Sequence, residues 1–212
     1  MKKIECRRCG TCCVKGGPVL HSDDLPLIRN KTIRLDQLVV IRKGEPAYNP
    51  ATDAVEPASC EMLKLQGKSG SWECLFYDAS QKSCTIHDNR PLECQLLQCR
   101  DTSAILAVTG KDCLSRQDII PPDDPALAYL QAFEQCSWEK VHLLLATLNT
   151  QSIQETEKIL CTDLLLRQQA VDRLQITLAQ ELFYFGRPMF QAFSHPGVQL
   201  TFEKGMPRLH LL

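Results

Sequence analysis

CRRCGTCC, at residues 6–13, places four cysteines within eight positions of the chain. Two overlapping C-x-x-C steps bring three sulfurs to one side of a tight loop, and Gly10 permits the turn. This spacing lets a short backbone hold several thiolates around one metal centre. Because the neighbouring Cys12 and Cys13 cannot both bind one tetrahedral ion with relaxed geometry, we expect one of them to serve a second centre.

Cysteine is the outlier of the composition, with 12 among 212 residues and ten of these before residue 114. Two lysines at residues 2–3 could begin a signal peptide, but charge and Cys6 arrive where an apolar stretch of roughly 7–15 residues should lie. We therefore expect a cytoplasmic protein. Since the cytosol keeps thiols reduced, a cysteine-rich chain there more often binds metal or performs redox chemistry than carries structural disulfides.

The rest of the composition is that of an ordinary globular protein, with 44% hydrophobic and 23% charged residues, which excludes a disordered tail. Lys and Arg total 24 against 25 Asp and Glu, a formal net charge of -1. Bulk positive charge therefore cannot drive nucleic-acid binding. No stretch approaches the roughly 18 uninterrupted apolar residues of a membrane-spanning helix, so we expect no membrane span.

The distribution of cysteines and turn signals predicts an α+β fold in two parts. Residues 1–118 are expected to form a small, irregular, metal-stapled N-terminal lobe with short strands. Residues 119–212 are expected to form a mainly helical region with a short C-terminal strand pair. The segment IIPPDDP, residues 119–125, is the predicted linker, because prolines interrupt regular structure there.

In the first part, residue patterns predict short elements. Asp36 is expected to cap a helical turn over 35–45. Residues 61–65 and 72–77 predict the two strands of a hairpin, and 82–88 predicts a third short strand.

In the second part, the hydrophobic period changes to that of a helix. Apolar residues recur at helical spacing from Ile153 to Phe185, with a break predicted near 162–163. Residues 198–202 and 208–212 predict a closing strand pair.

Beyond the first run, cysteines recur in the contexts ECLFYD, SCTIHD, RPLEC and GKDC. Taken in order, C-x-x-C-x-x-C-C, C-x-F-Y-D, C-x-I-H-x-x-R-P-x-x-C and a later isolated cysteine resemble the YkgJ-like cysteine-cluster proteins. These are the CxxCxxCC family, described as a zinc- or iron-chelating domain. The resemblance covers about residues 5–115. It implies a set of eight metal ligands: Cys6, Cys9, Cys12, Cys13, Cys74, Cys84, Cys94 and Cys113.

The same resemblance bears on the other candidate ligands. The family position of His87 is often Tyr, so His87 is not expected to be an essential ligand. Cys60 and Cys99 are additional to the usual eight, and the sequence leaves them balanced between packing and a supporting role. For Cys136 and Cys161, burial in an apolar core is the simpler expectation.

The spacing of the cysteines also bears on the metal. Structural zinc sites usually combine two C-x-x-C-type pairs, whereas Cys94 and Cys99 have four residues between them. C-x2-C-x2-C with a distant fourth cysteine is closer to an iron–sulfur run, and a similar run in the flagellin lysine methylases favours the same cofactor. We expect an iron–sulfur cluster of the 4Fe-4S kind, ahead of Zn²⁺ and of metal-free thiol chemistry. Flanking basic residues are expected to offset the thiolate charge: Arg7, Arg8, Lys15, Arg90 and Arg100.

This reasoning predicts a cytoplasmic metal-binding protein that transfers an electron or senses redox state or metal. The alternatives are a structural zinc module whose helical part docks a protein partner, and an accessory subunit of a larger enzyme. The sequence contains no G-x-G-x-x-G, G-x-x-x-x-G-K-[ST], G-x-S-x-G or H-E-x-x-H motif. It therefore leaves open whether the chain is itself an enzyme.

Overall fold

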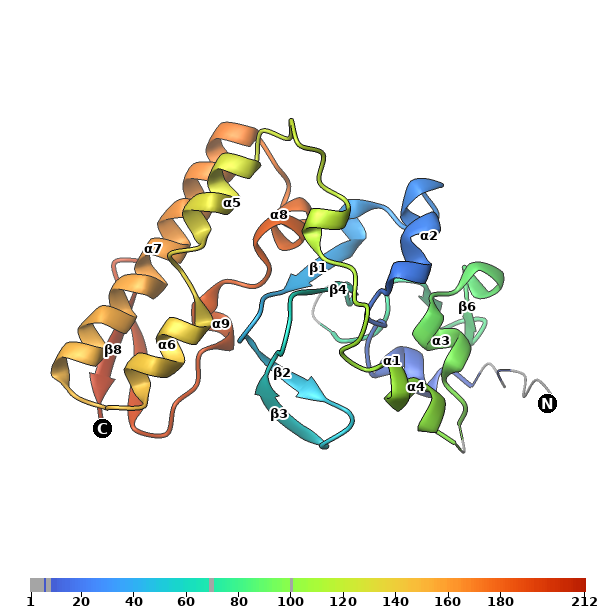
Figure 1. The fold of residues 1–212 in the computed structure, drawn as a ribbon, viewed down its shortest axis with the longest axis horizontal. Coiled ribbons are helices and arrows are strands. Elements are labelled where there is room, and N and C mark those ends of the chain that lie inside the picture. Colours follow the sequence, from blue (N-terminus) through green and yellow to red (C-terminus); the bar gives the residue numbers. More distant parts are fainter. Residues whose placement is uncertain (1–5, 7–8, 69–70, 100) are drawn as a thin grey trace.

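The computed structural model describes residues 6, 9–68, 71–99 and 101–212. The N-terminal half carries short antiparallel strands and the C-terminal half is dominated by helices, which confirms the predicted α+β class. Figure 1 places the long helix α7 (Thr150–Leu174) toward one end of the molecule and α1 (Thr11–Val14) toward the other. The strands β1 (Leu38–Ile41) and β4 (Met62–Leu65) lie between them.

Short helices and strands joined by loops make up the N-terminal half. Its further helices, where η denotes a 3₁₀ helix, are η1 (Ser22–Asp24), α2 (Leu25–Arg29), η2 (Leu35–Gln37), η3 (His87–Asn89), α3 (Leu92–Leu96), α4 (Ser103–Val108) and η4 (Arg116–Asp118). Its further strands are β2 (Pro46–Asn49), β3 (Ala54–Pro57), β5 (Tyr77–Asp78) and β6 (Ser83–Cys84). They form the antiparallel pairs β1–β4, β2–β3 and β5–β6.

The helical turn predicted over 35–45 is wrong beyond its start. Only η2 is helical, and the chain then extends into β1. Val39, Val40 and Ile41 explain the difference, because β-branched side chains lose rotamer freedom in a helix and fit a pleated strand.

The hairpin predicted between 61–65 and 72–77 is also wrong. β4 pairs instead with β1, and this pairing buries apolar side chains of both strands in one core: Leu38, Val40, Leu63 and Leu65. The segment 72–77 does not pair with 61–65; its Cys74 forms an antiparallel bridge with Gly67, and the backbone N–H of Cys74 donates to the carbonyl of Cys13 at 2.8 Å. The strand predicted over 82–88 is confirmed only at Ser83–Cys84, as β6, and its last residues enter η3.

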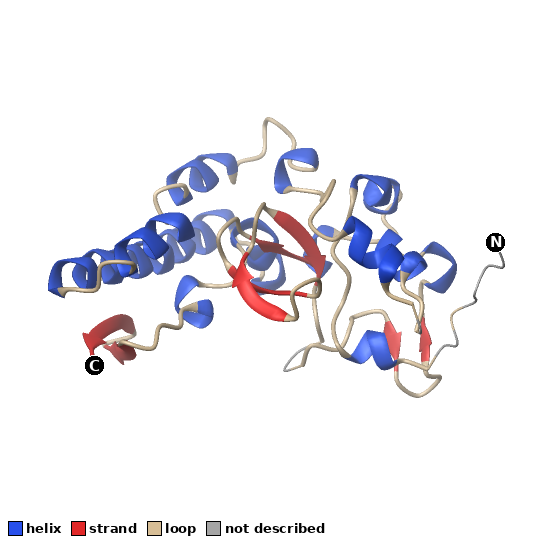
Figure 2. Ribbon diagram, turned by 60° about the horizontal axis from the view of Figure 1, so that its bottom comes forward, coloured by secondary structure: helices blue, strands red, loops and turns tan. Residues whose placement is uncertain are grey.

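Helices and one hairpin make up the C-terminal half. The elements besides α7 are α5 (Leu127–Phe133), α6 (Trp138–Leu145), α8 (Leu178–Phe185), α9 (Met189–Ala192), β7 (Val198–Glu203) and β8 (Met206–Leu211). The strand pair predicted at 198–202 and 208–212 is confirmed as β7–β8. In Figure 2 this hairpin lies at the helical end of the molecule, and β8 packs against α7.

The long helix α7 is continuous, so the break predicted near 162–163 is wrong. The helix begins after Asn149, whose side chain accepts the backbone N–H of Ser152 at 3.0 Å. It ends at Gln175, which adopts a φ of 51°. The interruption in the helical pattern therefore falls between α7 and α8. Within the described ranges, no helix is long and apolar enough to cross a membrane, and α7 is no exception.

Helix α8 ties the two halves together. Phe183 is 1% exposed and packs in the N-terminal core with Leu38 and Leu63. The β1–β4 pair is thus covered by a helix from the other half, which is a common way to bury one face of a small sheet. The predicted division of the chain into two folding units, residues 1–118 and 119–212, stays a prediction.

A buried network of charged side chains joins the same two halves. Asp163 of α7 has no exposed surface and accepts from both Arg42 and Arg167 at 3.0 Å. Arg187 pairs with Glu45, which is also fully buried, at 2.6 Å. Buried charges are tolerated only when they are paired and hydrogen-bonded. The network therefore fixes how α7 packs against the loop that follows β1.

Candidate metal centre

The first cysteine run turns at Gly10. Its φ of 77° lies in the left-handed region that favours glycine, and the chain continues as α1. The ring of Tyr77 lies against Gly10, where a Cβ would come within 2.5 Å of the Tyr77 Cζ atom. The backbone N–H of Val14 donates to the Gly10 carbonyl at 3.0 Å. Gly10 therefore sets the direction in which the cysteines of the run leave the turn.

Two strand-like contacts bring further thiols to this loop. The hydrogen bond from the backbone N–H of Cys74 to the Cys13 carbonyl places these two cysteines on adjacent backbone segments. Cys84 lies directly opposite Tyr77 in the β5–β6 pair. The tyrosine that supports Gly10 therefore also positions Cys84.

Helix α3 presents Cys94. The backbone N–H of Leu92 at its start donates to Asp24 Oδ1 at 2.8 Å. Asp24 is only 2% exposed and also accepts the backbone N–H of His21 at 2.9 Å. Arg90 Nε donates to the Cys94 carbonyl at 3.3 Å. The start of α3 is thus tied to the rest of the N-terminal half.

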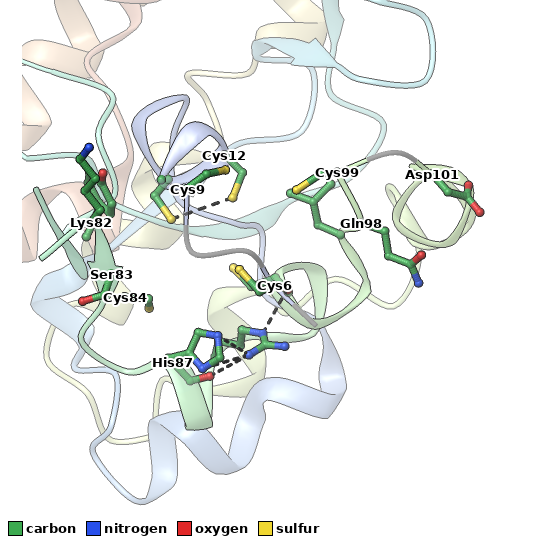
Figure 3. Close-up of a pocket in the computed structure, with 16 residues that line it drawn as sticks. Cys6, Cys9, Cys12, Lys82, Ser83, Cys84, His87, Gln98, Cys99 and Asp101 are labelled. Carbon is green, nitrogen blue, oxygen red and sulfur yellow. Dashed lines mark hydrogen bonds between the residues drawn. The ribbon is translucent and has the colours of Figure 1, made fainter. Parts of the chain in front are cut away.

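Two adjoining cavities, of about 240 and 100 Å³, lie where these elements meet. Figure 3 shows the labelled thiols of Cys6, Cys9, Cys12 and Cys84 around the larger one. Seven of the eight predicted ligands line one or both cavities: Cys6, Cys9, Cys12, Cys13, Cys74, Cys84 and Cys94. The structure thus gathers thiols that are up to 88 positions apart, from Cys6 to Cys94, into one region.

The sulfurs in this region have not converged on a single point. Cys12 Sγ and Cys13 Sγ are 4.0 Å apart, and Cys9 Sγ lies 3.4 Å from Thr11 Oγ1. Among the described residues, no three Cys, His, Asp or Glu side chains are placed to hold one metal ion together. Zinc–sulfur bonds are about 2.3 Å long, so binding must draw some of these sulfurs closer.

Cys113, the eighth predicted ligand, lies apart from both cavities. Its backbone pairs with that of His21, and its thiol contacts the thiol of Cys60. The two thiols donate to successive carbonyls, Cys60 to Gly110 at 4.0 Å and Cys113 to Lys111 at 3.7 Å. The structure therefore brings seven of the predicted ligands together and leaves Cys113 beside Cys60.

Of the two cysteines expected to pack in an apolar core, only Cys136 is among the buried residues of one. Cys136 is 3% exposed among apolar residues of the C-terminal half, although it lies in the loop before α6. Cys161 is half-buried in α7, and its thiol donates to the Pro207 carbonyl at 3.5 Å. Cys99, in contrast, lines the larger cavity.

A comparison with family models matches residues 5–113 to CxxCxxCC, described as a zinc- or iron-chelating domain. The match spans about half of the chain and contains all eight predicted ligands. The chain belongs to the CxxCxxCC family. Its membership confirms the resemblance drawn from the motifs and supports metal binding by a cysteine cluster. Comparison with curated proteins and with solved structures gives no significant match.

The donor chemistry of this CxxCxxCC domain fits the family description. Thiolates are soft ligands that select zinc, iron–sulfur clusters and Cu(I) over magnesium or calcium. Eight thiols, the seven predicted ones and that of Cys99, line the two cavities, which is enough for at least one four-thiolate centre.

Burial controls the protonation of the inner thiols of the CxxCxxCC domain. Desolvation raises the pKa of Cys13 to about 12, and repulsion from neighbouring thiolates adds to this. Desolvation also raises the pKa of Cys74 and of Cys94. The exposed Cys9 is the opposite case, because hydrogen bonds from Thr11 lower the pKa of its thiol.

We expect metal binding by the CxxCxxCC domain to release protons and to weaken as the pH falls. The raised pKa values keep the inner thiols protonated at neutral pH without metal, whereas metals bind the thiolate. Each proton released should make the apparent affinity about tenfold weaker per pH unit of acidification. Calorimetric titration with Zn²⁺ in buffers of different protonation enthalpy measures the number released. A value near zero between pH 6 and 8 would contradict the expectation.

One cation that lies near the thiols, Lys64, was not predicted from the sequence. Lys64 of β4 donates through Nζ to the carbonyl of Gly17. Burial lowers the pKa of Lys64, and the nearby carboxyl of Glu93 and thiols of Cys74 and Cys94 act in the opposite direction. Lys64 belongs to no motif, and it reaches the site only because β4 pairs with β1. A buried ammonium group can offset the charge of nearby thiolates.

The flanking cations that the sequence predicted have different outcomes. Arg90 lines the larger cavity, and Lys82, which was not predicted, lines it as well. Lys15 is exposed at the end of α1. Three of the predicted cations lie outside the described residues: Arg7, Arg8 and Arg100.

Gly10→Ala is expected to destabilise the CxxCxxCC domain by about 1–3 kcal/mol, because of backbone strain together with a clash. The added Cβ would meet the Tyr77 ring at a φ of 77°. Gly205→Ala is the matched control, since Gly205 has a φ of 79° and nothing within 4 Å of an added Cβ. Urea unfolding gives both changes in the free energy of unfolding. Equal losses in the two variants would show that the Tyr77 contact contributes nothing.

Proposed function

We propose that this protein holds an iron–sulfur cluster, of the 4Fe-4S kind, on the cysteines that line the two cavities, and that the cluster transfers an electron or senses redox state or metal. The observation that carries the proposal is the set of eight thiols that line two adjoining cavities, the larger of about 240 Å³. Seven of the thiols come from the first cysteine run, the loop before β5, strand β6 and helix α3.

The size of the cavity favours a cluster over a single ion. A structural zinc ion is enclosed by four ligands in direct contact, which leaves no open space between the sulfurs. The larger cavity, in contrast, is about 240 Å³. It is therefore several times larger than one water molecule, which occupies about 30 Å³ of liquid. The described donors, in addition, do not form a group of three around any one point. A larger inorganic core, held by thiolates from several elements, suits this arrangement better.

The surroundings of the cavities suit a redox centre. The wall of the smaller cavity carries apolar side chains, including Leu65, Phe76 and Ile86. Lys82 and Arg90 line the larger cavity and supply positive charge to a cluster whose four thiolates make it negative. Burial, hydrogen bonds and nearby charge are the features that set the potential of a cluster.

The outer side of the site is open to a partner. Three of the four first-run cysteines that line the larger cavity are exposed: Cys6, Cys9 and Cys12. A cluster held here would lie near the surface, where an electron can pass to or from a docked redox protein. The same exposure would let an oxidant reach the cluster, which is what a sensor requires.

A redox titration tests the proposal. Protein prepared without oxygen and loaded with ferrous iron and sulfide is reduced stepwise with dithionite, while visible absorption and electron paramagnetic resonance are recorded. We expect reversible bleaching over repeated cycles for electron transfer, and loss of the cluster on oxidation for sensing. A colourless protein that takes up zinc and shows no redox couple would overturn the proposal and leave a structural zinc module.

A further inference from the structure

Cys99 lies in a turn that is held at both ends. Gln98 and Asp101 pair across this turn as an antiparallel bridge, and the Asp101 N–H donates to the Gln98 carbonyl at 3.3 Å. Asp101 then accepts the backbone N–H of Ser103, at the start of α4, at 2.9 Å. Helices α3 and α4 pack against each other. Gln98 and Asp101, which flank this turn, are therefore anchored, and the position of Cys99 follows from that of α3.

The thiol of Cys99 faces the other cysteines. Cys99 lines the larger cavity and is exposed, and its side chain interacts with that of Cys9. Figure 3 shows the Cys99 sulfur directed toward the thiols of Cys9 and Cys12, while Gln98 and Asp101 point away. An exposed thiol in a wall of thiols has no apolar core to pack into, so packing does not explain its placement.

Cys113 shows the opposite arrangement. Its thiol contacts Cys60 and donates to the Lys111 carbonyl at 3.7 Å. Among the described residues, the walls of the two thiol-lined cavities include Cys99 and do not include Cys113 or Cys60.

We infer that Cys99 is a metal ligand of this chain and completes, in place of Cys113, the set of eight thiols around the two cavities. The inference rests on the proposed function, in that the thiols there hold metal. Eight thiols are enough for two centres with four thiolates each. Cys60 and Cys113 then form a separate thiol pair outside the metal site. The set is therefore Cys6, Cys9, Cys12, Cys13, Cys74, Cys84, Cys94 and Cys99.

The test compares three serine variants of the full chain: Cys99→Ser, Cys113→Ser and, as the matched control, Cys161→Ser in α7. Each is loaded with iron and sulfide without oxygen, and metal and sulfide per chain are measured beside the wild type. Circular dichroism and thermal melting show whether each variant folds. The loaded wild type is also alkylated with iodoacetamide, and peptide mass spectrometry reports which thiols are protected. This second measurement does not depend on whether any variant folds.

We expect Cys99→Ser to lose the centre that Cys99 binds, which is all of the metal if the thiols hold one cluster and about half if they hold two four-thiolate centres. Cys113→Ser and Cys161→Ser should hold the full amount, and Cys99 should be protected from alkylation while Cys60 and Cys113 react. Full metal in Cys99→Ser, with Cys113 protected, would overturn this inference alone. Zinc in place of iron, lost on Cys99→Ser, would uphold the ligand and overturn the cluster. A wild type that holds no metal would overturn both.

Discussion

Asp163→Asn is expected to lower the free energy of unfolding by about 3–5 kcal/mol. The substitution keeps the shape of the side chain but removes the negative charge that both Arg42 and Arg167 contact at 3.0 Å. Asp163 has no exposed surface and Arg167 is 2% exposed, so water cannot replace the lost partner. Two guanidinium groups would then be buried with too little negative charge nearby. Urea unfolding followed by circular dichroism measures the loss.

Asp172→Asn on the same helix is the control. Asp172 is exposed and its carboxylate accepts from Gln168 at 3.0 Å. Its substitution should change the free energy of unfolding by no more than about 0.5 kcal/mol. If Asp163→Asn were as stable as Asp172→Asn, the buried network would not hold the two halves together as described.

Removing the metal is expected to open the cysteine segment and leave the helices intact. Of residues 71–99, those in the buried hydrophobic core are Cys74, Phe76 and Tyr77, so apolar burial alone gives this segment little stability. Metal bound to cysteines contributes its binding free energy directly to folding. After chelation, hydrogen exchange of peptides from 71–99 should become at least about tenfold faster. Mass spectrometry with and without the chelator measures the change.

Peptides from α7 serve as the internal control in the same experiment. Their core includes Ile153, Ile159 and Leu160, packed with residues of α6 and β8, and it owes nothing to the cysteines of the first run. We expect their exchange to be unchanged. Identical exchange of 71–99 in the loaded and chelated protein would show that this segment folds without metal.

The sequence predicted the fold where local patterns act alone. Two short strand-like segments near the end of the chain identified the β7–β8 hairpin, and helical spacing identified the region of α7 and α8. The sequence failed to predict features that depend on contacts between residues far apart in the chain. The partner of β4 is β1, and the choice depends on which strands share a core with Phe183 of α8. The break near 162–163 does not occur because the polar residue there, Asp163, is buried by pairing with arginines.

The candidate site shows the same division. The cysteine motifs, through the family resemblance that they carry, identified seven of the eight thiols that line the cavities, because metal ligands recur in recognisable motifs. Motifs did not place Cys99, whose turn brings it to the cavity, or Lys64, which reaches the thiols through the β1–β4 pairing. They also placed Cys113 with the other seven, whereas its own strand-like pairing with His21 carries it to Cys60. These positions depend on tertiary contacts that cysteine spacing does not encode.

The most direct test of the central claim is the metal and sulfide content of the full chain, purified without oxygen and without added metal. Mass spectrometry of the metals and a colorimetric assay of acid-labile sulfide give both quantities per chain. The proposed cluster predicts iron and sulfide in about equal amounts with little zinc, because a 4Fe-4S core contains both in equal number. Zinc at about one or two ions per chain, with neither iron nor sulfide, would contradict it.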